Sequence, residues 1–332
     1  MMFQTEPNHF LQSFDSPAIY WLMDATTRLG YNSAFIAVAI VLIFGIHMKK
    51  AFLATHMLIW TGFAGALLKD FFALPRPENV DSSLKHLVDE FNAASPFVRK
   101  GGESFFSLPT PEAIEYYREN KLDSYGFPSG HVSGSVAYWG GIGLLFNRTW
   151  VRVAAIIIIA LMPFSRMYLG RHFLADVLGG LVLGGITVWL AWFFLIKKNK
   201  LSAYLSLSRL RLQMNMPTLI FISSCVILPI IFIVLGNSIA AQFLGLNIAF
   251  LLIGLQGFPS DEGKWPIRVL RVVLAIAVLV GSSILLDQLI RAVGLKGNDT
   301  VLLIKRALEM FLLIWGSTAI AKKLGWYKSQ TR

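Results

Sequence analysis

Long apolar runs alternate with short polar connections along most of the chain. Several runs approach the roughly 20 residues that a helix needs to cross a bilayer, and charged residues lie mainly in the connections. The pattern predicts an all-α, polytopic membrane bundle of about nine transmembrane helices. We expect these helices near residues 32–48, 52–75, 129–146, 152–170, 172–196, 217–236, 238–257, 267–290 and 301–321.

Composition supports a membrane protein. Of the 332 residues, 55% are hydrophobic and only 15% are charged, whereas soluble domains carry about 25% charged residues. The net charge of +11 would favour nucleic-acid binding in a soluble protein. Here the basic residues lie mostly in short loops, where they orient helices and face lipid headgroups. We therefore expect membrane lipids, and no nucleic acid, as partners, and the pattern is compatible with a homo-oligomer.

The polar connections predict how the helices are oriented in the membrane and divide the chain into two regions. Basic residues cluster in alternate loops, such as Lys49–Lys50 and Lys197–Lys198, which the positive-inside rule places in the cytoplasm. The long polar loop 76–127, with a short helix around Pro111–Asn120, then lies on the extracytoplasmic side. A shift in composition near 197–216 separates residues 1–200, which we expect to form the catalytic core, from an additional transmembrane region, 201–332.

The start of the chain and the single cysteine bear on targeting and on disulfide bonds. The first thirty residues lack the basic start and apolar block of a cleavable signal peptide. Aromatic residues such as Phe10, Phe14 and Trp21 instead favour a helix that lies in the membrane interface. Cys225 is the only cysteine in the sequence, which excludes an intrachain disulfide framework.

Ionisable and small polar residues gather at the outer ends of four predicted helices. Such residues are costly near lipid unless they face protein or water, so they are candidates for function. They are Lys69, Arg76, Ser129, Gly130, His131, Arg166, His172 and Asp176.

These residue types suit a phosphate group. Lys69, Arg76 and Arg166 offer charged donors for phosphoryl oxygens. The backbone N–H groups of Ser129 and Gly130 lie near a predicted helix start, which is a common anion site. His172 and Asp176 are four residues apart and should share one helix face.

Two histidines permit two roles in phosphoryl transfer. A carboxylate bonded to one nitrogen of His172 would leave the other nitrogen free to attack phosphorus. His131, which has no such carboxylate in its motif, is the better candidate for giving a proton to the leaving alcohol.

Together these residues resemble the motifs of the type-2 phosphatidic acid phosphatase (PAP2) superfamily, which includes lipid phosphatases, glucose-6-phosphatases and vanadium haloperoxidases. Three blocks occur in order between residues 50 and 196: Lys69 with Arg76-Pro77, Pro128-Ser129-Gly130-His131, and Ser165-Arg166 with His172 and Asp176. The narrower likeness is to bacterial members with added C-terminal helices, in the inner or cell membrane.

The resemblance implies a haloperoxidase-like helical core and a reaction that needs neither metal nor cofactor. It implies that His172 is the nucleophile that becomes phospho-histidine, with Asp176 as its partner and His131 as the acid. It also implies that the phosphoryl oxygens are held by Lys69, Arg76, Ser129, Gly130 and Arg166.

The leading hypothesis is a hydrolase that acts on a lipid phosphate or diphosphate, with its active site on the extracytoplasmic side. Two alternatives stay open: a lipid phosphotransferase with the same phospho-histidine, and a lipid transporter or flippase that only binds phosphate. A vanadium peroxidase is disfavoured, because those relatives are soluble. Undecaprenyl diphosphate, phosphatidylglycerol phosphate, phosphatidic acid and a sphingoid-base phosphate all fit as substrates.

Overall fold

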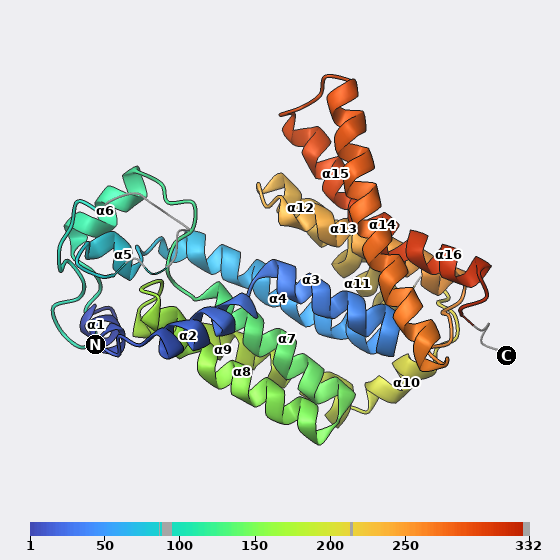
Figure 1. Ribbon diagram of the computed structural model, residues 1–332, viewed down its shortest axis with the longest axis horizontal. Helices are drawn as coiled ribbons and strands as arrows, with labels where there is room; N and C mark the ends of the chain where they lie inside the picture. The colour runs from blue at the N-terminus through green and yellow to red at the C-terminus, as the bar shows by residue number, and fades with distance from the viewer. Residues whose placement is uncertain (86, 88–94, 213–214, 328–332) are drawn as a thin grey trace. The chain divides into compact units, whose positions relative to one another are not determined.

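The computed structural model describes residues 1–85, 87, 95–212 and 215–327 (Figure 1). The described residues form helices and no strand, which confirms the predicted all-α class. The chain divides into two compact units. The first comprises Met1–Val38 and Lys50–Lys200, and the second comprises Ala39–Lys49 and Leu201–Arg332.

The first unit holds every candidate site residue. Its elements are α1 (Glu6–Gln12), α2 (Pro17–Arg28), α3 (Asn32–Ile40, which runs into the second unit), α4 (Met48–Phe72), α5 (Pro77–Val80), α6 (Pro111–Glu119), α7 (Gly130–Phe146), α8 (Thr149–Tyr168), α9 (Leu174–Ala191) and the π-helical η2 (Trp192–Lys197). The expected interfacial helix is two helices, α1 and α2, and the chain bends by 62° between α2 and the helical segment that begins at Asn32.

Local chemistry sets several helix ends. Proline stands in the first turn of α2, α5 and α6, where its missing N–H has no intrahelical partner to lose. Gly170, with φ of +72°, follows α8 in the left-handed conformation that ends many helices. The turn at Gly170 starts the short link to α9, consistent with the predicted helix ranges 152–170 and 172–196.

Close approach of α7 and α9 depends on glycine. A Cβ atom at Gly184 would lie 2.6 Å from the Ser133 carbonyl oxygen, and one at Gly180 would lie 2.8 Å from that of Ser129. Small residues four apart allow two helix backbones to meet in this way. This contact places the start of α9 directly beside the start of α7.

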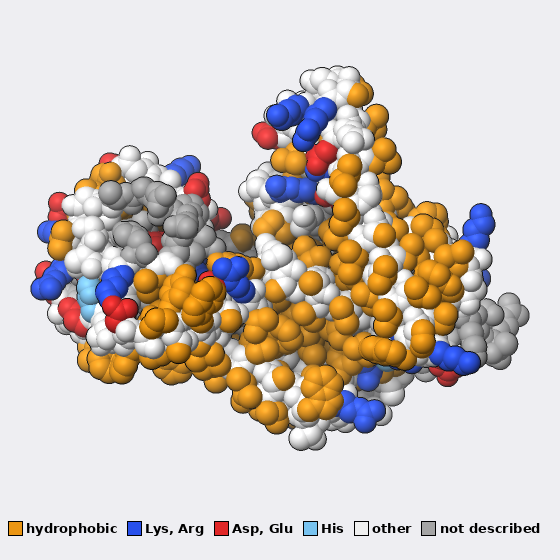
Figure 2. All heavy atoms as spheres, in the orientation of Figure 1, with side chains coloured by type: hydrophobic (Ala, Val, Ile, Leu, Met, Phe, Trp, Pro, Cys, Tyr) orange, Lys and Arg blue, Asp and Glu red, His pale blue; other side chains and the backbone are white. Residues whose placement is uncertain are grey.

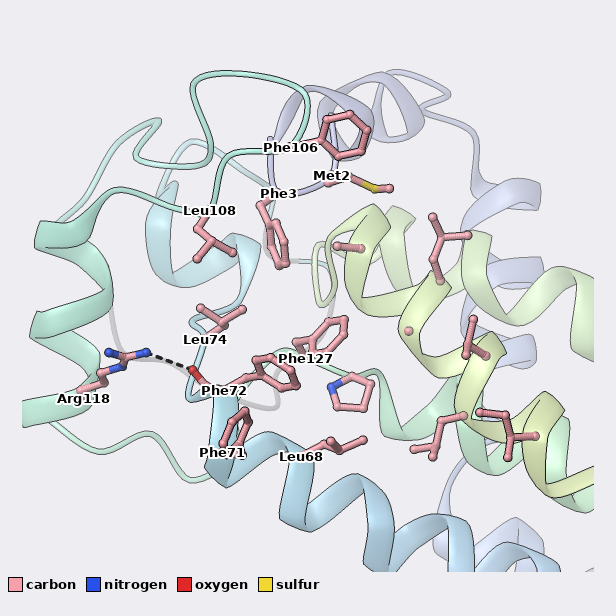
Figure 3. A pocket seen from close by; sticks show the side chains of 17 residues that line it. Met2, Phe3, Leu68, Phe71, Phe72, Leu74, Phe106, Leu108, Arg118 and Phe127 are labelled. Atoms are coloured by element: carbon pink, nitrogen blue, oxygen red, sulfur yellow. Dashed lines mark hydrogen bonds between the residues drawn. The ribbon is translucent and has the colours of Figure 1, made fainter.

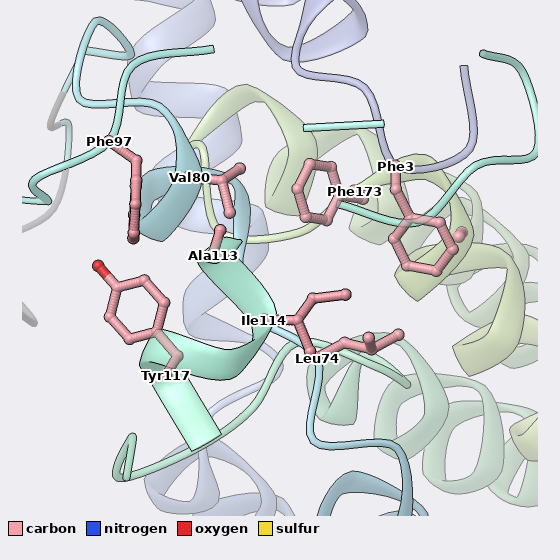
Figure 4. Packing of buried hydrophobic residues seen from close by; sticks show 9 residues of the cluster. Phe3, Leu74, Val80, Phe97, Ala113, Ile114, Tyr117 and Phe173 are labelled. Atoms are coloured by element: carbon pink, nitrogen blue, oxygen red, sulfur yellow. The ribbon is translucent and has the colours of Figure 1, made fainter. Parts of the chain in front are cut away.

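The loop between α4 and α7 packs on the first unit through its own small core. The buried cluster joins α5, α6, the N-terminal segment and the start of α9 (Figure 4). Its members are Phe3, Leu74, Val80, Phe97, Ala113, Ile114, Tyr117, Phe173 and Ala175. The helix α6 confirms the expected short helix, whereas residues 86 and 88–94 of the predicted 76–127 loop lie outside the described residues.

The second unit combines the C-terminal helices with an earlier segment. Its elements are η1 (Val41–Ile46), α10 (Lys200–Ser206), α11 (Met216–Ile222), η3 (Ser223–Ile227), α12 (Leu228–Val234), α13 (Ile239–Gln256), α14 (Trp265–Ala292), α15 (Asp299–Phe311), η4 (Leu312–Gly316) and α16 (Ser317–Lys323). The Met48 N–H donates to Asp261 Oδ1 (2.9 Å), and Lys49 Nζ donates to the Leu207 carbonyl (2.6 Å).

Five helical segments of the described chain are long and apolar enough to span a membrane, or six if the bent pair that begins with α2 is one span. They are Met48–Val80, Thr149–Tyr168, Leu174–Lys197, Ile239–Gln256 and Trp265–Ala292. The remaining predicted runs are also helical but are shorter or interrupted, so the count of nine stays a prediction. Figure 2 shows hydrophobic side chains spread over the helices of both units, as in a multi-pass membrane protein.

Candidate active site

The centre of the site is a buried His172–Asp176 pair. Their Nδ1 and Oδ2 atoms are 3.2 Å apart, and the two residues are 1% and 0% exposed. His172 lies before α9, not on it, which corrects the expectation that both residues share one helix. Asp176 stands in the first turn, where the same Oδ2 accepts the N–H of Phe173, the residue before the helix (2.9 Å). The cap of α9 therefore fixes the carboxylate that orients the imidazole.

The start of α7 adjoins this pair. Ser129 caps α7, and its N–H donates to the Asp176 carbonyl (2.9 Å). The next residue, Gly130, is exposed, and a Cβ atom there would lie 4.0 Å from Lys69 Cε. A helix N-terminus with a lysine beside it is suited to an anion.

His131 lies in the first turn of α7 and is held by its surroundings. Its ring packs edge-on against Tyr31, with 5.1 Å between centroids. A Cβ atom at Gly30 would lie 2.9 Å from His131 Cδ2, so the glycine makes room for the ring. Its Nε2 has no hydrogen-bond partner among the described residues, which suits a nitrogen that exchanges a proton with a substrate.

Lys69 and Arg76 flank the end of α4 and hold the segment that leads into α7. Lys69 Nζ donates to the carbonyl groups of Tyr125 and Gly126. The Arg76 guanidinium donates to the Ser124 carbonyl (2.9 Å) and to Ser124 Oγ (3.1 Å). Both cations thus lie where the 123–126 backbone turns toward the site.

Arg166 approaches the site from the last turn of α8. It is 1% exposed, and its Nη1 donates to Thr27 Oγ1 (2.6 Å). Arg76, Arg166, Lys69 and His131 all lie close enough to His172 to act on it electrostatically. The structure therefore gathers the sequence-predicted cations around one buried imidazole.

Sequence reasoning missed two contributors to this arrangement. Arg171 pairs with Glu78 (2.8 Å) and joins the link before α9 to α5. Its position next to His172 in the sequence was the available signal. Thr27, the partner of Arg166, carries no motif and is 139 residues away in sequence. Only the fold brings it to the site.

An apolar groove of about 800 Å³ lies beside the site (Figure 3). Its walls come from the end of α4, the first half of α9 and the N-terminal segment, and include Leu68, Phe71 and Val182. Pro128 and Ala175 also line it, and they immediately precede Ser129 and Asp176. The groove is thus contiguous in sequence and space with the polar residues. Arg118 on α6 lies at the groove and donates to the Phe72 carbonyl (3.2 Å).

Metal ligands do not cluster in the described part of the chain. No group of three or more His, Cys, Asp or Glu side chains there is arranged to hold a metal ion. The residues gathered at the site offer a nucleophile, acid–base groups and cations that can stabilise an anion.

Comparison with known proteins points to one family. Residues 50–200 match the model of the PAP2 superfamily. The chain is 23% identical over 202 residues to lipid A 4'-phosphatase of Bacteroides thetaiotaomicron, which covers 59% of this chain and 77% of the relative. It is 40% identical over 83 residues to phosphatidylglycerophosphatase B of Bacillus subtilis, which covers 22% of this chain and only 38% of that relative.

Two solved structures are similar to part of this chain. The transmembrane PAP2-type phosphatidylglycerolphosphate phosphatase of Bacillus subtilis has a TM-score of 0.42 and 22% identity, over 58% of this chain and 84% of that one. Aquifex aeolicus LpxE has a TM-score of 0.40 and 17% identity, over 57% of this chain and 94% of that one. The segment 50–200, which contains all three motif blocks, is thus the part of this chain that is similar to the PAP2 superfamily.

Proposed function

We propose that the protein hydrolyses a lipid phosphate or diphosphate through a phospho-histidine at His172, without a metal ion. The observation that carries the proposal is the buried His172–Asp176 contact of 3.2 Å, with three cations and the start of α7 around it. A transporter that only bound phosphate would need the cations but not an imidazole oriented by a carboxylate.

The first step transfers the phosphoryl group to the enzyme. With Nδ1 of His172 held by Asp176, Nε2 attacks phosphorus while the bond to the lipid oxygen breaks. His131 gives its proton to that oxygen, so the lipid leaves as an alcohol or, from a diphosphate, as a monophosphate. Lys69, Arg76 and Arg166, with the N–H group of Gly130, stabilise the charge on the phosphoryl oxygens. The Ser129 N–H, which the sequence also suggested as a phosphate donor, is instead bonded to the Asp176 carbonyl (2.9 Å).

The second step restores the enzyme. Water attacks phosphorus, the bond to His172 Nε2 breaks, and inorganic phosphate leaves. His131, now neutral, accepts the proton of the attacking water, so one histidine serves as acid and then as base.

A membrane lipid is the substrate class that the site favours. The groove adjoins the residues that would hold phosphate, so hydrocarbon can remain in an apolar environment while the headgroup reaches His172. The relatives are named for lipid A and phosphatidylglycerophosphate, which are both membrane lipids. The basic loops Lys49–Lys50 and Lys197–Lys198 favour an extracytoplasmic site in a bacterial cell membrane.

The test is phosphate release by purified protein in detergent with EDTA. We expect wild-type protein to release phosphate from at least one of the four lipid phosphates named above, and His172→Ala to release none. A requirement for divalent metal, or a normal rate in His172→Ala, would refute the mechanism. Phosphate found on an added acceptor lipid would identify a transferase, and lipid flipping that persists in His172→Ala liposomes would identify a transporter.

A further inference from the structure

The link that carries His172 is held from outside by the N-terminal segment. His172 lies between α8 and α9, so no helical hydrogen-bond ladder fixes its backbone. The first helix, α1, supplies two buried amide side chains on the face that meets this link: Asn8 is 0% exposed and Gln12 is 4% exposed. Buried amides stay in place when their hydrogen bonds are made.

Asn8 bridges both ends of the link. Its Nδ2 donates to the Met167 carbonyl (2.8 Å) and to the His172 carbonyl (3.0 Å). The first of these carbonyls belongs to the last turn of α8 and also accepts the Gly170 N–H (3.0 Å). Asn8 Oδ1 is buried with no partner among the described residues, so the two donated bonds are what Asn8 supplies.

Neighbouring residues of the same segment hold the flanks of the link. Gln12 Nε2 donates to the Tyr168 carbonyl (3.0 Å), and the Ala175 N–H donates to the Met2 carbonyl (2.9 Å). The Phe3 ring packs edge-on against Phe173, with 5.7 Å between centroids (Figure 4). Among these contacts, the bond from Asn8 is the one made to His172 itself.

We propose that Asn8 is a positioning residue for the nucleophile. The inference rests on the proposed function, because its catalytic consequence requires His172 to attack phosphorus. Attack needs the imidazole in line with the scissile bond, and a displacement of about 1 Å can lower the rate about 100-fold. Asn8 sets the backbone from which the imidazole projects, and Asp176 sets the rotation of the ring.

The test compares Asn8→Asp with Gln12→Glu. Both changes keep side-chain shape and replace an amide donor by a carboxylate on the same buried helix face. We expect Asn8→Asp to lower kcat about 10- to 100-fold with KM within about twofold. Gln12 Nε2 donates to the carbonyls of Lys85 (3.1 Å) and of Tyr168 (3.0 Å), which lies four residues before His172. Gln12→Glu should therefore lower kcat less than about threefold at a similar loss of Tm.

Hydrogen exchange supplies a readout that needs no substrate. Amides of residues 168–175 should exchange faster in Asn8→Asp than in Gln12→Glu. The proposal would be overturned if Asn8→Asp kept the wild-type kcat or left hydrogen exchange of residues 168–175 unchanged. It would also be overturned if kcat fell in proportion to Tm in both variants. If Asn8→Asp does not fold, Asn8→Ala is measured against the same criteria. A wild-type protein that releases no phosphate would refute the proposed function, whereas the exchange experiment would still decide whether Asn8 holds the link.

Discussion

At the residue scale, the chemistry depends on which nitrogen of His172 faces the substrate. Asp176 Oδ2 both contacts His172 Nδ1 (3.2 Å) and accepts the Phe173 N–H (2.9 Å). One oxygen thus joins the helix cap to the nucleophile. The tautomer with hydrogen on Nδ1 leaves the Nε2 lone pair for attack.

Asp176→Asn tests this coupling. The amide keeps the size of the side chain but removes the charge that favours hydrogen on Nδ1. We expect kcat for lipid phosphate hydrolysis to fall about 10²- to 10⁴-fold, as when the orienting carboxylate of a serine protease is amidated. Measured Tm should stay within a few degrees of wild type. A kcat within tenfold of wild type would show that Asp176 does not set the tautomer.

Asp81 connects α1 to the α4–α7 loop and gives a pH-dependent prediction. Burial alone would raise the pKa of Asp81, but hydrogen bonds from Ser83, His9 and Thr5 outweigh burial and lower the pKa to about 2. The ordinary value is about 3.9. Stabilisation by the carboxylate is therefore complete above about pH 4 and is lost as the pH falls through about 2.

Asp81→Asn should accordingly lower Tm by a few degrees at pH 7, because buried donors lose a charged acceptor at a cost of about 1–3 kcal/mol. The difference in Tm between wild type and variant should shrink as the pH is lowered from about 4 toward 2. Thermal melts in detergent at several pH values measure both effects. A difference in Tm that is absent at pH 7, or that grows as the pH is lowered, would contradict the stabilising role of the Asp81 carboxylate.

At the element scale, the site is assembled by the close packing of α7 and α9. The Ser129 N–H donates to the Asp176 carbonyl (2.9 Å), so the start of α7 and the cap of α9 beside His172 are directly bonded. The glycines of α9 keep these two helix starts in contact.

Adjacent glycines on α9 provide a matched pair of variants. A Cβ atom at Gly184 would lie 2.6 Å from a backbone oxygen of α7, whereas one at Gly185 would meet no atom within 4 Å. We expect Gly184→Leu to lower Tm and to reduce lipid phosphatase activity more than tenfold, because α9 must move away from α7. Gly185→Leu should retain activity near wild type. Equal activities for the two variants would contradict the proposed assembly.

Element positions and motif residues were largely predictable, because apolar periodicity marks helices and the three motif blocks mark the site. The short connection at 169–173 was expected, but its register was not: His172 precedes α9 because Asp176 caps that helix through the Phe173 N–H. Asn8 could not be predicted at all. It lies 164 residues from His172 in sequence, and a single asparagine carries no periodic or motif signal.

At the scale of the whole molecule, the predicted catalytic residues all lie in the first unit, while residues 39–49 belong to the second. Apolar patterning does not predict that residues 39–49 pack with the C-terminal helices, because polar contacts hold them there. Asp261 accepts the Met48 N–H (2.9 Å), and Lys49 Nζ donates to the Leu207 carbonyl (2.6 Å). We propose that the 201–332 region enlarges the lipid-facing surface or mediates self-association.

A protease site inserted after Lys200 tests this organisation. Because residues 39–49 remain packed with the C-terminal helices, we expect the two fragments to co-purify after cleavage in detergent. Activity should stay at half of the uncleaved value or more, since no predicted catalytic residue is lost. Asp261→Ala should weaken co-purification. Fragments that separate without that substitution would contradict the assignment of 39–49 to the second unit.

The most direct test of the central claim is to trap the phosphorylated enzyme. Wild-type protein is mixed with lipid radiolabelled in its phosphate, quenched within one turnover and digested. The account predicts base-stable, acid-labile label on the peptide that contains His172, and none on His172→Ala. Rapid phosphate release with no label at His172, or label on another residue, would contradict it.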